Sequence, residues 1–235
     1  MTDQVLSSAP RVEIPASLNP MVFSAARAVG IMKPRFRPGQ NGSVFADELK
    51  ILGTAFWLKD YKVLITCAHV INDLVGAPVE VTGLLVVGNN GNYSRAVIDV
   101  IDLRRDLAVL RLEAASEIVE NESQSGLELD VLDPKVGTRV AYAGYPLGEK
   151  LITDKHAPTY AEGLVGSTER MGKDKKREIQ ITGPVVGGFS GSPIVAVEDG
   201  RKVLGIVSRG PSETKDIFFA VSAKHIKALA DLAIS

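Results

Sequence analysis

From about residue 50 onward, the chain consists of short segments in which apolar and polar residues alternate, separated by turn-forming residues. These segments are rich in Val, Ile, Leu, Thr and aromatic residues, a composition and period typical of β-strands. Five lie in the first half, at 53–58, 62–67, 79–87, 96–101 and 107–112, and six lie in the second half, at 139–144, 160–167, 178–182, 193–197, 203–208 and 217–221. So many short strands predict a closed all-β architecture, because closure removes exposed sheet edges.

A polar, acidic stretch between residue 113 and about residue 130 separates the two groups of strands. We therefore expect two packed barrels, the first over about 45–125 and the second over about 130–221. The end of the chain has a different pattern, because Ile226, Leu229 and Ala230 recur at helical spacing and Ser222 is a favourable N-cap. This pattern predicts a C-terminal α-helix over 222–233.

Residues 1–44 contain many Pro, Ser, Arg and Gly residues and show only weak periodicity. The segment 24–29 is compatible with one or two helical turns, but Pro34, Pro38 and Gly39 then interrupt the pattern. We expect these residues to form an N-terminal arm that packs on the body or is partly mobile, with the main domain over 45–235.

Composition and charge narrow the classes of partner. The 27 basic and 28 acidic residues give a net charge of −1, so we expect neither nucleic acid nor a membrane as a partner. A single cysteine, Cys67, excludes an intrachain disulfide and favours a reducing compartment. The N-terminus does not resemble a signal peptide and no apolar run reaches membrane length, so a cytoplasmic location is expected.

Three stretches carry candidate chemistry. Residues 64–70, Leu-Ile-Thr-Cys-Ala-His-Val, end an apolar strand at His69. Residues 106–112, Asp-Leu-Ala-Val-Leu-Arg-Leu, open another strand at Asp106. Residues 187–195, Gly-Gly-Phe-Ser-Gly-Ser-Pro-Ile-Val, place Ser190 in a glycine-rich turn before a third strand.

Acyl transfer by a serine requires these three residue types. A serine hydroxyl is a poor nucleophile at neutral pH unless a neighbouring imidazole takes its proton. A buried carboxylate must hold that imidazole in the right tautomer, and backbone N–H groups must stabilise the oxyanion. We therefore predict His69 as the general base, Asp106 as the residue that orients it and Ser190 as the nucleophile. The N–H groups of Gly188 and Ser190 are the predicted oxyanion hole.

These stretches resemble the chymotrypsin- and trypsin-like serine proteases. Residues 66–69, Thr-Cys-Ala-His, resemble that family's Thr-Ala-Ala-His; residues 106–110 resemble its Asp-Ile-Ala-Leu-Leu, and residues 188–193 resemble its Gly-Asp-Ser-Gly-Gly-Pro. The order His, Asp, Ser also matches this family and differs from the Ser, acid, His order of α/β-hydrolases. The resemblance covers about residues 50–235 and is nearest to the disulfide-free, Deg/HtrA-type bacterial protease domain, without a PDZ domain.

The resemblance implies an all-β fold of two six-stranded antiparallel Greek-key β-barrels (chymotrypsin-like) with a C-terminal α-helix. It also implies substrate-binding residues, because residues 205–210, Gly-Ile-Val-Ser-Arg-Gly, resemble the Gly-Ile-Val-Ser-Trp-Gly strand that pairs with the substrate backbone. Ser208, Arg209 and Gly210 are therefore expected to bind substrate.

The specificity pocket is expected to differ from that of trypsin. The position six residues before the nucleophile, which forms the base of the family's pocket, is the uncharged Pro184. By the same resemblance, Asp216 borders this pocket and would select substrates with Lys or Arg. Arg209 would instead favour acidic side chains of the substrate or neutralise Asp216. We expect a pocket that is not trypsin-like.

Phe189 occupies the position where digestive relatives have an aspartate that pairs with a freshly cut N-terminus. No Ile-Val-Gly-Gly activation site occurs early in the chain. We therefore expect activity that does not depend on N-terminal cleavage and is either constitutive or switched by a partner or ligand. The N-terminal arm is a candidate docking element for such a regulatory protein.

Some assignments have competitors. Asp102 lies four residues before Asp106, but only the latter immediately precedes the Leu-Ala-Val-Leu strand. Ser192 lies near Ser190, but the glycines and the following Pro193 favour Ser190 as the nucleophile. Cys67 is expected to be a small buried hydrophobe. The sequence has no His/Cys/Asp cluster with metal-ligand spacing and no phosphate-binding glycine loop, so we expect neither a metal nor a cofactor.

The leading hypothesis is therefore a serine endopeptidase that hydrolyses protein or peptide substrates through an acyl-enzyme. A partner-activated effector protease and a non-catalytic binding module on the same fold are the alternatives, because a fold does not guarantee a function.

Overall fold

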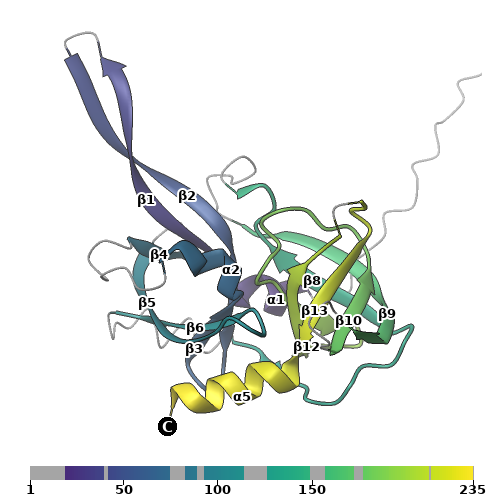
Figure 1. Ribbon diagram of the computed structural model, residues 1–235. Helices are drawn as coiled ribbons and strands as arrows, with labels where there is room; N and C mark the ends of the chain where they lie inside the picture. The colour runs from purple at the N-terminus through teal and green to yellow at the C-terminus, as the bar shows by residue number, and fades with distance from the viewer. Residues whose placement is uncertain are drawn as a thin grey trace, which may run out of the picture.

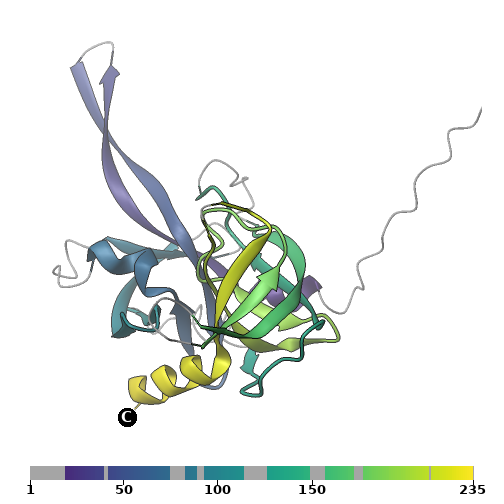
Figure 2. The same cartoon turned by 45° about the vertical axis from the view of Figure 1, so that its right-hand side comes forward.

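The strands form two β-barrels that lie side by side (Figures 1 and 2). The computed structural model describes residues 19–39, 42–74, 83–88, 93–113, 126–148, 157–171, 177–211 and 213–234. The prediction of two antiparallel barrels followed by a C-terminal helix is confirmed.

The first barrel is closed, with the strand order β1-β2-β3-β6-β5-β4. Its strands are β1 (Ala26–Gly39), β2 (Gly42–Leu58), β3 (Val63–Thr66), β4 (Leu84–Val87), β5 (Tyr93–Asp102) and β6 (Leu107–Leu112). Every residue of β3 is buried, which explains why this segment is apolar throughout rather than alternating. β3 leads through Cys67 into the short helix α2 (Ala68–Ile71), which is followed by the 3-10 turn η1 (Asn72–Leu74). The histidine on α2 is thus anchored to a fully buried strand.

The second barrel has the strand order β11-β8-β9-β10-β13-β12 and is closed by pairing of β11 with β12. Its strands are β8 (Arg139–Gly144), β9 (Thr159–Met171), β10 (Arg177–Thr182), β11 (Pro193–Ala196), β12 (Asp199–Arg209) and β13 (Ile217–Ser222). The two-residue strand β7 (Glu128–Leu129) pairs with β12 in parallel. The connection between β10 and β11 carries Ser190.

Part of the segment expected to be an N-terminal arm belongs to the first barrel. Helix α1 (Asn19–Ala25) precedes β1, which pairs with β2 along its whole length and with β4 through Ala28–Ile31. Residues 26–29 are all buried, so the alternation that identifies a half-exposed strand is absent from the sequence here. Residues 1–18 of the predicted arm, and residues 75–82, which include the start of the predicted strand 79–87, lie outside the described residues.

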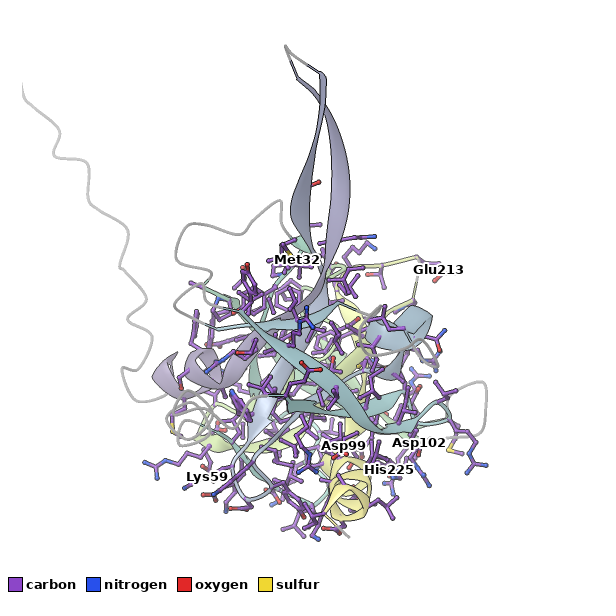
Figure 3. All side chains as sticks on the ribbon, turned by 90° about the vertical axis from the view of Figure 1, so that its left-hand side faces the viewer. Met32, Lys59, Asp99, Asp102, Glu213 and His225 are labelled. Carbon is purple, nitrogen blue, oxygen red and sulfur yellow. The ribbon has the colours of Figure 1, made fainter. Side chains whose placement is uncertain are left out.

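β1 and β2 continue beyond the first barrel as a long two-stranded ribbon (Figures 1 and 3). β4 pairs with β1 only as far as Ile31, so beyond that residue β2 is the partner of β1 among the described strands. On the outer edge of a two-stranded ribbon there is no neighbouring strand to accept a backbone N–H, so a proline there costs no hydrogen bond. A strand can therefore include Pro34 and Pro38, which the sequence pattern indicated as breakers.

One hydrophobic cluster joins the two barrels. Trp57 and Leu110 of the first barrel belong to the same buried cluster as Val195 and Ile206 of the second. Helix α5 (Ala223–Ala233) leaves the second barrel and lies against β5 and β6 of the first (Figure 1). Since protein interiors are close-packed, a shared core holds the loops at the seam between the barrels in fixed relative positions.

The cap predicted for the C-terminal helix is present, because the Ser222 Oγ accepts a hydrogen bond from the Lys224 N–H at 3.4 Å. Ile226, Leu229 and Ala230 form the buried face of α5, as their spacing predicted. The helices in the described part of the chain are too short or too polar to cross a lipid bilayer.

Candidate active site

His69 and Asp106 form a hydrogen-bonded pair. The His69 Nδ1 lies 2.8 Å from the Asp106 Oδ2 and 2.9 Å from its Oδ1, and the backbone N–H of His69 donates to Oδ1 at 2.9 Å. Because a carboxylate only accepts hydrogen bonds, Nδ1 is the donor in this contact, which leaves Nε2 as the acceptor whenever the ring carries a single proton. The competing carboxylate, Asp102, instead accepts from the Arg105 side chain at 2.8 Å.

Asp106 is held from both barrels. The Ser208 hydroxyl, on β12, donates to the Asp106 Oδ2 at 2.5 Å. The backbone φ of Asp106 is +57°, in the left-handed region where Asn and Asp are the most frequent non-glycine residues. Burial alone would raise the pKa of the Asp106 carboxyl. Hydrogen bonds from His69 and Ser208, together with the charge of His69, outweigh the effect of burial, so the pKa lies below its ordinary value. Asp106 is therefore ionised at neutral pH.

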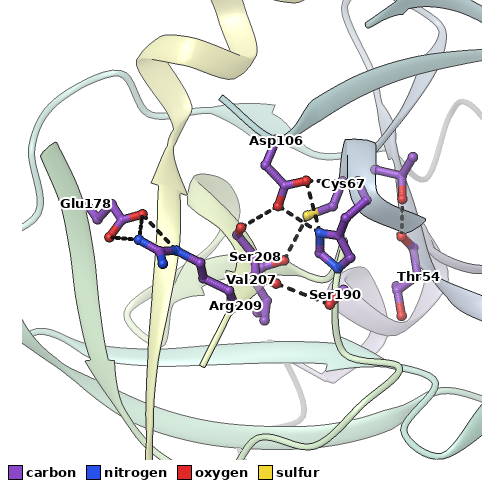
Figure 4. Close-up of polar contacts among 10 residues, drawn as sticks. Thr54, Cys67, Asp106, Glu178, Ser190, Val207, Ser208 and Arg209 are labelled. Carbon is purple, nitrogen blue, oxygen red and sulfur yellow. Dashed lines mark hydrogen bonds and ion pairs between the residues drawn. The ribbon is translucent and has the colours of Figure 1, made fainter. Parts of the chain in front are cut away.

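Ser190 lies in a tight turn that is tied to both barrels. Its carbonyl accepts from the Thr54 N–H on β2 at 2.8 Å, and the next residue, Gly191, donates its N–H to the Val207 carbonyl on β12 at 2.8 Å. The Ser190 Oγ donates to the Ser208 carbonyl at 3.2 Å, so the side chain lies beside the Ser208–Asp106 contact (Figure 4). Its position is thus fixed by the backbone on either side.

The backbone before Ser190 has the form of an anion site. Gly188 has a φ of +101°, and a Cβ at this position would lie 2.1 Å from the Tyr145 carbonyl oxygen, so only glycine fits. Among the described residues, the N–H groups of Gly188 and Ser190 donate to no protein acceptor. Two neighbouring N–H groups without a protein partner can stabilise an oxyanion.

His69, Asp106 and Ser190 line one cleft of about 840 Å³ that is open at the surface. A sequence profile of the trypsin-like peptidase domain matches residues 53–206, more than half of the chain. This chain belongs to the trypsin-like peptidase family. The predicted resemblance to trypsin-like proteases is thereby confirmed.

The fold of this trypsin-like peptidase is similar to that of the HtrA-type protease AlgW, solved with a decapeptide. The two superpose with a TM-score of 0.69 at 18% sequence identity, over 90% of this chain and 64% of the AlgW chain. This chain therefore corresponds to less than two thirds of the AlgW chain, and the likeness concerns the fold. No curated protein matches the sequence.

A second, smaller cavity of about 130 Å³ in the peptidase also borders Ser190. Ser208, Arg209 and Gly210, the predicted substrate-binding residues, line this cavity. Its remaining walls are formed by residues just before Ser190, within β12 and just after β12, namely Val185, Val186, Gly187, Val207, Pro211, Thr214 and Lys215.

Pro184 and Asp216, predicted to form the specificity pocket, do not line it. The Val185 N–H donates to the Lys215 carbonyl and the Gly183 N–H donates to the Asp216 carbonyl, both at 2.8 Å, so these segments run side by side. The walls of the cavity that these segments form carry Val185, Val186, Thr214 and Lys215.

The sequence did not single out Thr54, which holds the turn before Ser190 in this peptidase. Its buried hydroxyl donates to the Gly188 carbonyl at 2.8 Å and accepts from the Tyr145 N–H at 3.1 Å. A threonine within an apolar strand has no sequence signal beyond β-propensity. The hydrogen bond from the Ser208 hydroxyl to Asp106 was not predicted either. The family resemblance of residues 205–210 predicts only that their backbone pairs with the substrate.

Phe189 anchors the turn by packing. Its ring is buried and makes an edge-to-face contact with Tyr142, with ring centroids 5.4 Å apart. An aspartate at this position would require a cationic partner once buried, whereas Phe189 requires only apolar neighbours. Phe189 therefore holds the turn through apolar packing, without an ion pair.

Within the described residues, Cys67, His69 and Asp106 place their ligand atoms within 4.8 Å of one another, which the spacing in the sequence did not suggest. Metal binding would require a thiolate at Cys67. Burial, followed by the charge of Asp106, raises the pKa of the Cys67 thiol well above its usual range. The thiol instead donates to the Val207 carbonyl at 3.1 Å, so the cluster fits a His–Asp pair backed by a buried thiol better than a metal site.

Proposed function

We propose that this trypsin-like peptidase is a serine endopeptidase in which Ser190, His69 and Asp106 act as nucleophile, general base and orienting carboxylate. The observation that carries this proposal is the His69–Asp106 pair, which leaves the Nε2 of His69 as an acceptor in the cleft that Ser190 also lines. No cofactor takes part in this mechanism.

In the proposed reaction, the Ser190 Oγ attacks the peptide carbonyl while the His69 Nε2 takes its proton. The ionised Asp106 stabilises the imidazolium that forms, and the N–H groups of Gly188 and Ser190 stabilise the oxyanion. His69 then gives the proton to the leaving amine, and water hydrolyses the acyl-enzyme by the same route. A serine hydroxyl moves between acceptors by rotation about one bond, so its hydrogen bond to the Ser208 carbonyl is compatible with transfer to His69.

Labelling by a fluorophosphonate probe tests this proposal. Such probes react with a serine whose proton is removed by a neighbouring base, so we expect one adduct per folded chain, mapped by peptide mass spectrometry to Ser190. Unfolded protein is the control and is expected to remain unlabelled. A folded chain that does not react, with or without peptide substrate, would instead support the non-catalytic alternative.

The small cavity beside Ser190 predicts the residue before the cleaved bond, called P1. Its walls include Val185, Val186, Val207 and Lys215, and none of the described carboxylates lines it. A cationic side chain there would lose water without gaining a partner. We expect cleavage after Val or Ala to exceed cleavage after Lys or Arg by roughly a hundredfold in kcat/KM. A peptide library profiled by mass spectrometry measures this ratio, and a profile dominated by Lys or Arg would contradict it.

A further inference from the structure

Four arginines line the large cleft beside His69. Arg104 and Arg105 come from the loop before Asp106, Arg177 from the start of β10 and Arg209 from the end of β12. The carboxylates that line the same cleft are Asp106 and Glu178. Cationic side chains from three separate segments therefore converge on the cleft that contains the catalytic pair.

Both carboxylates of the cleft already have partners. Asp106 accepts hydrogen bonds from His69 and Ser208. Glu178 accepts from the Arg209 Nη2 at 2.8 and 2.9 Å through its two oxygens, as Figure 4 shows. Its side chain is only 16% exposed, whereas that of Arg209 is 47% exposed. The arginine thus presents more of its surface to the cleft than the carboxylate does.

Arg209 and Arg105 retain hydrogen-bond donors for a ligand. Arg209 uses Nε and Nη2 for Glu178, and Arg105 uses Nη1 for Asp102. In the described residues, the Nη1 of Arg209 and the Nε and Nη2 of Arg105 donate to no protein acceptor. Guanidinium groups with donors to spare bind carboxylates through two parallel hydrogen bonds.

Arg209 is also held in place on its other side. Its guanidinium carbon lies 5.5 Å from the centre of the Phe219 ring, on β13. Because Glu178 and Phe219 fix this side chain before a ligand arrives, little side-chain entropy is lost on binding.

His225 on α5 also lines this cleft (Figure 3), but it adds no charge at neutral pH. Burial, followed by the neighbouring charge of Arg105, lowers the pKa of its imidazole. The positive charge of the cleft therefore comes from the arginines.

The direction of a bound peptide links this cleft to particular substrate positions. A substrate strand that runs along Ser208–Gly210 points alternate side chains to opposite sides. If P1 enters the small cavity beside Ser190, then the second and fourth residues before the cleaved bond, P2 and P4, point to the opposite side of the Ser208–Gly210 segment. The arginine-lined cleft meets the small cavity at Ser190, Ser208 and Arg209 and otherwise has different walls, so it is the cleft available to these side chains.

We infer that the cleft selects substrates that carry Glu or Asp at P2 or P4, bound by Arg209 and Arg105. This inference rests on the proposed function and names the substrate class of the same site.

Four matched peptides test it with the wild-type chain. Each is internally quenched and has Val at P1, and the four differ only by Glu or Gln at P2 and P4, which changes charge and not size. We expect Glu at one or both positions to raise kcat/KM by about tenfold at low salt, and this advantage to shrink at about 0.5 M salt because exposed charges are screened. Equal rates for Glu and Gln, or slower cleavage with Glu, would overturn the inference.

Single substitutions locate the selection. Arg105→Gln and Arg209→Gln are each expected to lower the Glu/Gln ratio several-fold. The control is Arg139→Gln, which also removes an arginine from an exposed ion pair, with Glu162 at 2.8 Å, but lies outside the cleft. An equal fall in the ratio with Arg139→Gln would show an effect of total charge and reject the cleft.

The same measurements separate the two proposals. If all four peptides are cleaved at equal rates, the inference fails and the proposed function stands. If none is cleaved and the fluorophosphonate probe does not react, the proposed function fails and the inference fails with it.

Discussion

Substitution of Ser190 by Ala is expected to lower kcat for peptide hydrolysis by about a millionfold, because it removes the nucleophile and leaves only binding and oxyanion stabilisation. The change removes one oxygen, whose hydrogen bond in this structure is to the Ser208 carbonyl at 3.2 Å. The backbone contacts that hold the turn, including the Thr54 N–H to the Ser190 carbonyl, do not involve that oxygen. Peptide affinity, measured by fluorescence anisotropy, should therefore be retained while turnover is lost.

Ser192→Ala is the matched control for that experiment. This serine lies two residues further along the same turn and is fully buried, and its Oγ has no hydrogen-bond partner among the described residues. Removal of an unsatisfied buried hydroxyl is neutral or stabilising. We expect Ser192→Ala to keep a kcat near that of the wild type. Equal turnover in Ser190→Ala and Ser192→Ala would show that the reaction does not pass through Ser190.

Substitution of Asp106 by Asn is expected to lower kcat by about 10⁴-fold while the chain remains folded. The amide nitrogen of an Asn at this position would donate to the ring of His69, so the ring would carry its proton on Nε2 and could no longer accept one from Ser190. The amide keeps the shape of the carboxyl and can still accept the hydrogen bond that Ser208 makes now. The loss is therefore expected in kcat, determined from initial rates between pH 6 and 9.

Asp99→Asn is the control for this substitution. Asp99 is also an ion-paired aspartate of the first barrel, with the Arg111 side chain 2.6 Å from its Oδ2, but it does not line the cleft. Its replacement should change kcat by less than twofold, since exposed ion pairs contribute little. A loss in Asp106→Asn no larger than in Asp99→Asn would show that the His69–Asp106 pair has no role in turnover.

The sequence predicted most strands because they are short runs rich in Val, Ile, Leu and aromatic residues, whether or not the run alternates; β3 and β4, for example, are buried throughout. It failed at β1, where residues 26–29 are all buried but include only one residue typical of strands, Val29. Pro34 and Pro38 added to the error. A strand can contain a proline wherever no neighbouring strand needs a backbone N–H at that position, and this depends on how the strands pair. That information is a property of strand pairing and cannot be obtained from local composition.

The candidate site was predictable to the extent that its chemistry lies in short motifs. His69, Asp106 and Ser190 each stand beside a strand with distinctive neighbours, and the structure brings all three to one cleft. Thr54 and the hydroxyl of Ser208 act through contacts between segments more than 100 residues apart, for which a single sequence has no signal. The specificity pocket remains a prediction: Pro184 and Asp216 do not line the small cavity beside Ser190, but their sequence neighbours Val185 and Lys215 do.

The single thiol of the chain makes the junction between the barrels chemically observable. Cys67, at the end of β3, is fully buried, and its thiol donates to the Val207 carbonyl on β12 of the other barrel. An alkylating reagent can reach this atom only when the two halves part, so the rate of modification by iodoacetamide reports the frequency of that opening. The same protection leaves any cysteine introduced at the surface as the sole site for attachment of a fluorophore to the folded chain.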